Sequence, residues 1–171
     1  MGLKLIFSNG NTEERLNAGT VTRISGELIT VRDQSLKKME EHVKKGNELP
    51  FDPEGAYLFF AAPTPGYKEN RASIGPTTSW RMGKYIPFLI ELGVKGFIGK
   101  GFLPEGIPEI IKRNKALYFQ ALGGAGAYYG SQVTAMEAIM FEELGPEAIF
   151  KIKVADFPLV ISIDTRGAIF S

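Results

Sequence analysis

Three neighbouring segments decide the fold: VKGFIG at 94–99, PEGIPEIIKRN at 104–114 and ALYFQAL at 116–122. The first and the third predict short strands, and the segment between them predicts a helix. Alternation of strand, helix and strand is typical of an α/β domain in which some strands pair in parallel. The sequence therefore predicts the α/β class.

The segments before this unit extend the pattern. AYLFFAA at 56–62 is short and dense in aromatic residues, which favours a buried strand that ends at Pro63. The stretch 63–79 is rich in turn formers and predicts a long loop that leads to a helix start at 77–79. That helix is predicted to run to Gly93, with apolar residues at helical spacing at Met82, Ile86, Leu89 and Ile90.

The first part of the chain predicts a hairpin and a helix. Extended residues at 21–31 surround Gly26-Glu27, which we interpret as the turn of the hairpin. Asp33 is then expected to cap a helix to about Lys45, because Gly46 follows as a residue that adopts positive φ. Near the other end of the chain, LVISID at 159–164 predicts a last strand.

Composition restricts the class of protein. The chain has 171 residues, no repeat and no linker, which predicts one domain over 1–171. Its 20 Lys and Arg residues nearly balance 19 Asp and Glu residues, so nothing indicates nucleic-acid binding. No apolar run reaches the roughly 18 residues of a membrane span. The first residues lack the pattern of a secretory signal, so we expect a cytoplasmic protein.

The scarcity of Cys and His restricts the chemistry. With no Cys and one His, the chain cannot build a Cys-ligated metal site, and a Cys nucleophile or a Ser/His pair is disfavoured. His42 falls on the polar side of the helix predicted after Asp33, where we expect a solvated residue. Acid–base groups must therefore be Thr, Tyr, Lys or carboxylates, or come from a partner chain.

The segment GPTTSWRM at 75–82 is the strongest candidate site. It places the hydroxyls of Thr77, Thr78 and Ser79 at a predicted helix start, with Arg81 about one turn further on. Free N–H groups, hydroxyls and a guanidinium together attract a carboxylate or a phosphate. The alternative is that Thr78 or Ser79 only caps the helix and Arg81 is a surface residue.

Three further segments are weaker candidates. Lys100 lies between two glycines at a predicted strand end and offers a positive charge, although a glycine-rich turn explains it as well. Arg32 and Asp33 follow the predicted hairpin, and an Asp33 cap paired with Arg32 would explain both residues without a function. The glycines of 123–126 do not fit a dinucleotide motif, so we favour close packing.

Taken together, these motifs resemble the C-terminal domain, or separate β subunit, of the class I fumarate hydratase and L-tartrate dehydratase family of iron–sulfur hydro-lyases. The resemblance extends from about Val21 to Gly167 and keeps the order of the family's motifs. Those motifs are SGELITVRD, ELPFDPEGAYLFFAAPTP, SIGPTTSWRM, ELGVKGFIGKG, LGGAGA, FEELGPEAI and DFPLVISIDTRG.

The resemblance implies a swivelling β/β/α domain that docks on a larger α subunit. In this family the α subunit carries a [4Fe-4S] cluster on Cys residues, so the resemblance implies a Cys-bearing partner for this chain, in a homodimer or α2β2 assembly. The implied reaction is the reversible hydration of fumarate to malate, with L-tartrate or another 2-hydroxy dicarboxylate as the alternative substrate. A module that binds dicarboxylates without catalysis is a further alternative.

The resemblance also implies roles for single residues. Thr77 would act at the proton to be removed, helped by a carboxylate of the partner, while Arg81, Arg32 and Lys100 would hold the substrate carboxylates, with Thr78 and Ser79 beside them. Two positions depart from the family pattern. Leu36 stands where many relatives carry a His, and we expect it on the apolar face of the helix. Trp80 replaces a residue that is often Gly in fumarases, which would reshape the pocket wall.

Overall fold

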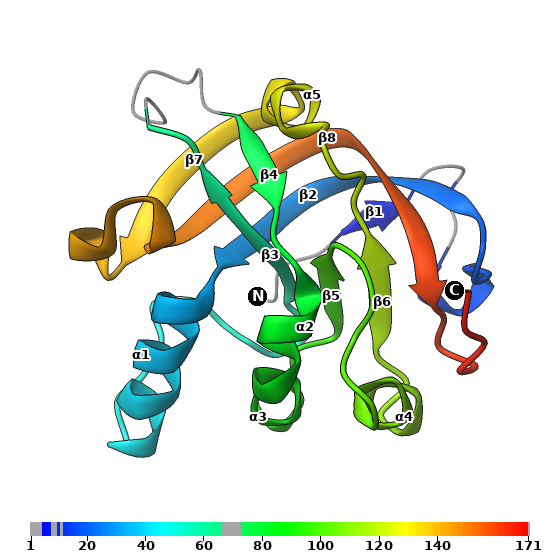
Figure 1. Ribbon diagram of the computed structural model, residues 1–171, viewed down its shortest axis with the longest axis horizontal. Coiled ribbons are helices and arrows are strands. Elements are labelled where there is room, and N and C mark those ends of the chain that lie inside the picture. The colour runs from blue at the N-terminus through cyan, green and yellow to red at the C-terminus, as the bar shows by residue number, and fades with distance from the viewer. Residues whose placement is uncertain (1–4, 8–9, 11, 66–72, 171) are drawn as a thin grey trace.

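The structure, a computed structural model, is built on a closed sheet. Strands β2 (Val21–Val31), β3 (Tyr57–Pro63), β5 (Gly96–Gly99) and β6 (Leu117–Gln120) pair in parallel in this order. Strand β8 (Ile149–Ile163) pairs antiparallel with β6 and also with β2. Because the last strand joins both ends of the row, the sheet closes into a barrel (Figure 1).

Three shorter pairings extend this barrel. β1 (Ile6–Phe7) lies antiparallel to β2, β4 (Ile74–Pro76) to β3, and β7 (Val133–Met140) to β8. The described residues are 5–7, 10, 12–65 and 73–170.

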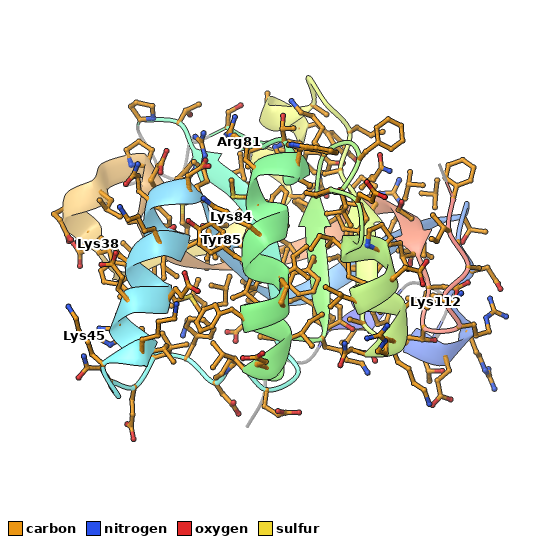
Figure 2. The ribbon with its side chains drawn as sticks, turned by 60° about the horizontal axis from the view of Figure 1, so that its bottom comes forward. Lys38, Lys45, Arg81, Lys84, Tyr85 and Lys112 are labelled. Atoms are coloured by element: carbon orange, nitrogen blue, oxygen red, sulfur yellow. The ribbon has the colours of Figure 1, made fainter. Side chains whose placement is uncertain are left out.

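Helices cover one face of the sheet. This layer consists of α1 (Asp33–Lys44), α2 (Ser79–Met82), the 3₁₀ turn η4 (Gly83–Tyr85), α3 (Ile86–Glu91) and α4 (Ile107–Arg113) (Figures 1 and 2). α5 (Gly126–Ser131) packs against β4 instead. The turns η2 (Glu13–Arg15) and η5 (Glu142–Glu147) complete the helical elements of the described residues.

Strand β3 shows why two apolar cores form. Tyr57 and Phe59 point into the core enclosed by the barrel, whereas Leu58 and Phe60 point into the core between the sheet and the helices. Side chains of a strand alternate between its faces, so a strand buried on both faces has no polar positions. This explains the continuous apolar run of the segment and confirms the predicted buried strand, which ends at Pro63.

The α/β class is confirmed. β5, α4 and β6 form the predicted strand–helix–strand unit, and the two strands pair in parallel with Gly96 opposite Leu117. The predicted helix after residue 32 is also present, and Gly46 after it has a φ of 81°. Among the described residues, no helix has the length and apolar character needed to cross a membrane.

The predicted hairpin over 21–31 is wrong, because these residues form the single strand β2. Gly26 has a φ of 136° and lies where the register against β8 shifts, between Ile24 and Gly26. The glycine therefore forms a bulge that bends the strand and does not reverse the chain. The strand predicted at 159–164 is only the end of the 15-residue β8.

The segment after β3 is more ordered than expected. The long loop predicted over 63–79 includes β4, which returns along β3 with Pro76 opposite Ala61, while residues 66–72 lie outside the described residues. The predicted helix from 77–79 to Gly93 consists of α2, η4 and α3. Pro87, which has no N–H to donate, lies in the first turn of α3 and explains why the helix restarts there.

Asp164, after β8, is fully buried and supports the chain around it. Its carboxylate accepts hydrogen bonds from the backbone N–H groups of Ala18 (3.1 Å), Arg166 (2.9 Å) and Ala168 (3.1 Å) and from the Arg166 guanidinium (2.9 Å). Burial alone would raise the pKa of Asp164, but these donors hold it below the ordinary value. The ionised carboxylate is therefore part of the fold.

We expect Asp164→Asn to lower the free energy of unfolding by about 3 kcal/mol, because an amide accepts fewer hydrogen bonds and leaves buried N–H groups unpaired. Because the pKa is lower in the folded state, the wild-type contribution is present above the unfolded-state pKa and is lost as pH falls through the folded-state value. Urea unfolding at several pH values measures both effects. Asp156→Asn, at an exposed position, is the control and should change little.

Candidate functional site

The candidate residues lie at the carboxyl ends of the parallel strands. Arg32 follows β2, Lys100 follows β5, and Thr77 returns to this edge through β4, where its N–H donates to the Phe60 carbonyl at 2.7 Å. In α/β proteins with parallel strands, both open and closed sheets place ligands outside the carboxyl ends of the strands, where loops from several strands meet. Segments far apart in the sequence thus form one cluster.

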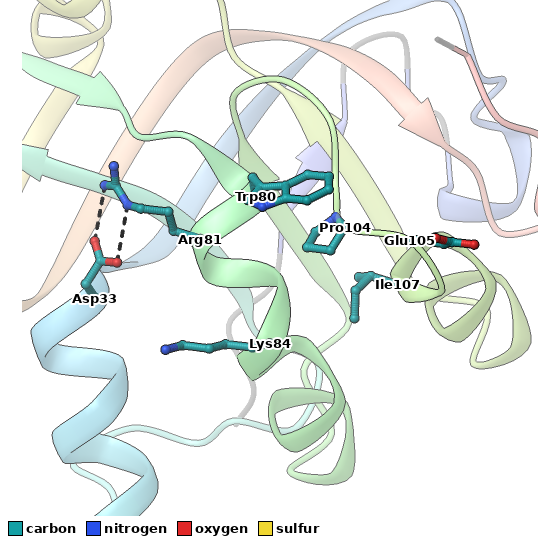
Figure 3. Close-up of a pocket in the computed structure, with 7 residues that line it drawn as sticks. All are labelled: Asp33, Trp80, Arg81, Lys84, Pro104, Glu105 and Ile107. Atoms are coloured by element: carbon teal, nitrogen blue, oxygen red, sulfur yellow. Dashed lines mark hydrogen bonds and ion pairs between the residues drawn. The ribbon is translucent and has the colours of Figure 1, made fainter.

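Arg81 is the centre of this cluster. Its Nε and Nη2 atoms donate to the two carboxylate oxygens of Asp33, at 3.3 and 3.2 Å (Figure 3). Nη2 also donates to Thr77 Oγ1 at 2.9 Å. A cationic donor on a hydroxyl oxygen favours negative charge on that oxygen, which is the environment that a hydroxyl in proton transfer requires.

The start of α2 is attached to the turn after β5. The Ser79 N–H donates to the Lys100 carbonyl at 2.9 Å, and the Lys100 N–H donates to Ser79 Oγ at 3.0 Å. Thr78 occupies the cap position, is exposed and makes no side-chain capping bond. Ser79 is fully buried, so its hydroxyl holds the two loops together and is not presented to solvent.

Tyr118 on β6 supports the same junction and was not found from the sequence. Its hydroxyl lies 2.9 Å from Ser79 Oγ and 2.7 Å from the Gly101 carbonyl. The carbonyl can only accept, so the single phenol proton goes to Gly101 and Ser79 donates to the phenol oxygen. Burial raises the pKa of Tyr118 to about 12, opposed by the hydrogen bond with Ser79. Tyr118 therefore remains protonated at neutral pH.

The glycines near the candidate site leave space for different neighbouring groups. The Lys100 side chain is exposed, and a Cβ on Gly123 would lie 3.3 Å from its Cδ atom, so the glycine leaves room for the lysine stem. A Cβ on Gly99 would lie 1.8 Å from Ser79 Oγ. The space that this glycine leaves is therefore filled by the Ser79 side chain and is not open to a ligand. A Cβ on Gly126 would lie 3.5 Å from Gly75, which is an ordinary contact distance, and one on Gly124 would meet nothing within 4 Å, so close packing does not explain these two glycines. Gly124 has a φ of 76°, a conformation that favours glycine.

The expected pairing of Arg32 with an Asp33 cap is wrong. Arg32 occupies the cap position, where its N–H donates to Ser35 Oγ at 2.9 Å, and its Nη2 atom lies 3.9 Å from Glu147. Asp33 is the first helical residue and pairs with Arg81. Arg32 Nε is buried and has no hydrogen-bond partner among the described residues, which leaves this cation incompletely paired.

An open pocket of about 430 Å³ adjoins Arg81 on the helical side. It is lined by Asp33, Trp80, Arg81, Lys84, Pro104, Glu105 and Ile107 (Figure 3). The Trp80 indole is directed over Pro104 and is 58% exposed, so this residue forms the wall of the pocket. Trp80 thus lines a pocket beside Arg81, and its effect on a substrate pocket stays a prediction.

The remaining sequence expectations concern α1. Leu36 is fully buried between the sheet and the helices, which confirms its place on the apolar face. His42 is half-buried, not fully solvated as expected, because its Nε2 atom lies 2.9 Å from the Glu48 carbonyl and its ring meets Phe141. Within the part of the chain that the structure describes, no group of three or more His, Cys, Asp or Glu residues could hold a metal ion.

The structure thus brings the predicted site residues together in part. Thr77 contacts Arg81 directly, and Thr78 and Ser79 meet the backbone of Lys100. Arg32 lies at the same edge but is directed towards Glu147. The catalytic and binding roles of these residues stay predictions.

Comparison with known proteins gives a consistent family. The family described as "Fumarase C-terminus" matches residues 8–171. The L(+)-tartrate dehydratase subunit beta of Escherichia coli is 33% identical over 89% of this chain and 77% of its own length. The anaerobic class I fumarate hydratase of Escherichia coli is 34% identical over 85% of this chain but only 28% of its own length, so the chain spans less than a third of that relative. The chain belongs to the fumarase C-terminal family.

Proposed function

We propose that this chain is the β component of a hydro-lyase that adds water reversibly to fumarate, with dehydration of L-tartrate as the alternative reaction. The observation that carries the proposal is the contact of Arg81 with both a carboxylate and the Thr77 hydroxyl at the carboxyl ends of the strands. Arg81 already binds the Asp33 carboxylate through two donors, which is the chemistry that a dicarboxylate substrate requires.

In this proposal the iron–sulfur cluster belongs to a partner. The chain has no Cys, and its described residues offer no group of metal ligands, so they do not fit a [4Fe-4S] cluster. The names of its relatives support a subunit partner, because the tartrate dehydratase relative is itself a β subunit. We therefore assign to this chain only the binding of carboxylate groups and the movement of one proton.

The free donors of the cluster define where a substrate carboxylate would bind. Nε and Nη2 of Arg81 are occupied by Asp33 and Thr77, and among the described residues Nη1 has no partner. A carboxylate on Nη1 would lie beside the Thr77 hydroxyl, which would then remove the proton from the adjacent carbon atom. Removal of that proton spreads negative charge into the carboxylate, and the Arg81 cation stabilises this charge.

Lys100 and Arg32 would hold the second carboxylate of the substrate. The Lys100 side chain is exposed at the same edge. Arg32 would contribute mainly its positive charge, because its unpaired Nε is buried and its Nη2 is directed towards Glu147. Because a hydroxyl with an ordinary pKa is a weak base, Thr77 still needs a proton acceptor, which we assign to a carboxylate of the partner.

We expect the isolated chain to bind no iron and to show no hydratase activity, because it lacks thiolates and a metal-ligand cluster. Co-purification should yield a Cys-bearing partner, and anaerobic mixing with that partner should produce turnover of fumarate or L-tartrate, measured by absorbance. Activity of the isolated chain after metal removal would contradict the two-subunit proposal. A complex that binds dicarboxylates without turnover would instead support the non-catalytic module.

A further inference from the structure

Arg81 would be poorly ordered without an anchor. Its side chain is 50% exposed, and a long exposed side chain loses considerable entropy when it is held in a single conformation. Asp33 provides an anchor on two of the guanidinium nitrogens. The remaining contact, from Nη2 to Thr77 Oγ1, depends on the same orientation of the guanidinium plane.

Asp33 is itself held in place by the fold. It is the first residue of α1, next to the cap, where Ser35 accepts from the Arg32 N–H and donates to the Arg32 carbonyl. Leu36 and Met39 anchor the same helix in the core. A carboxylate is also favoured in the first turn of a helix, because the free N–H groups there carry partial positive charge.

We propose that Asp33 is a positioning residue for Arg81. Its carboxylate fixes the guanidinium so that Nη2 stays on Thr77 and Nη1 faces outward to receive a carboxylate of the substrate. Asp33 then acts on substrate only through Arg81 and takes no part in proton transfer. This inference deepens the proposed function and rests on it for the identity of the ligand.

The exposure of the Asp33–Arg81 ion pair allows an experiment to distinguish a positioning role of Asp33 from a role in folding. Asp33 is 34% exposed and Arg81 is 50% exposed, and ion pairs with this exposure contribute little to folding. We therefore expect Asp33→Asn to fold normally, with a melting temperature close to that of the wild type. Glu40→Gln is the matched control, since Glu40 forms an ion pair with Lys44 on the same helix and does not contact Arg81.

The first measurement follows the Arg81 Nε–H signal by NMR in the full chain, assigned from its loss in Arg81→Lys. In the wild type and in Glu40→Gln this proton should exchange slowly with solvent. In Asp33→Asn exchange should accelerate at least about tenfold, because the acceptor loses its charge and the guanidinium becomes mobile. Unchanged exchange in Asp33→Asn, or equal acceleration in the control, would overturn the inference. If Asp33→Asn fails to fold, the pair is structural and the inference is also wrong.

The second measurement titrates the same proteins with fumarate and with L-tartrate while following the Thr77 methyl signal. We expect binding by Asp33→Asn to be weaker by about three- to tenfold, because an unoriented Arg81 must be ordered on binding. Tighter binding in the variant would show that Asp33 competes with the ligand and would overturn the inference. If neither dicarboxylate binds the wild-type chain or its complex with the partner while the Arg81 Nε–H remains protected, the proposed function fails and the positioning of Arg81 by Asp33 stands.

Discussion

A Thr77→Val variant is expected to lower kcat by about 100-fold or more in the active complex, while the dicarboxylate still binds. The change is nearly isosteric, but it removes the hydroxyl that accepts from Arg81 at 2.9 Å. The backbone bond from the Thr77 N–H to Phe60 is retained, so the loop should keep its position. Measurement of kcat, KM and melting temperature on one preparation tests the effect.

Three outcomes of this experiment have different meanings. A fall in kcat alone supports proton transfer at Thr77, whereas a rise in KM with kcat intact would assign to Thr77 only a hydrogen bond to the substrate. A loss of about 1 kcal/mol in stability without a kinetic defect would indicate a helix-start role. Thr134→Val, an exposed position on β7, is the matched control and should leave all three quantities unchanged.

Arg81→Lys is expected to cost about 2–4 kcal/mol of transition-state stabilisation, measured as kcat/KM. Lysine keeps the positive charge but lacks the planar set of donors, so it cannot hold Asp33 with two nitrogens and contact Thr77 and the substrate as well. The folded state should be little affected, because the pair with Asp33 is exposed.

Arg113→Lys provides the control for this substitution, since Arg113 is exposed at the end of α4. Its kcat/KM should equal that of the wild type. An Arg81→Lys enzyme with the same kcat/KM as this control would show that Arg81 is only a surface residue of the helix.

Local patterns predicted the elements whose partners are near in the sequence. β5, α4 and β6 follow one another in the sequence, and β5 pairs directly with β6. Local patterns therefore predict this unit correctly. The prediction of a hairpin in β2 is wrong because a glycine between extended residues is typical of a turn. Here a distant strand pairs with the residues on both sides of Gly26 and keeps the chain extended. That strand is β8, and no local feature of Gly26 indicates it.

The candidate site was predictable by residue type but not by pairing. Thr77 and Arg81 are four positions apart in one segment at a predicted helix start, so the sequence already places them near each other. Asp33 is 48 positions from Arg81 in the sequence. From the sequence alone, the neighbouring Arg32 is the more obvious ion-pair partner for Asp33. Tyr118 gave no signal either, because an aromatic residue in a buried strand is fully explained by packing until its hydroxyl is seen against Ser79.

The closure of the barrel by β8 also has a consequence for synthesis of the protein on the ribosome. Arg23 of β2 contacts Asp156 of β8, 133 positions later in the chain. At a translation rate of about 5–20 residues per second, Asp156 is synthesised roughly 7 to 27 s after Arg23. During this interval β2 can pair with β1 and β3, but its other edge lacks β8, and the core residues of β8 are not yet present to pack with Ile24 and Leu28. An unpaired strand edge beside apolar side chains is the kind of surface that favours aggregation of a nascent chain, and closure of the barrel by β8 removes it.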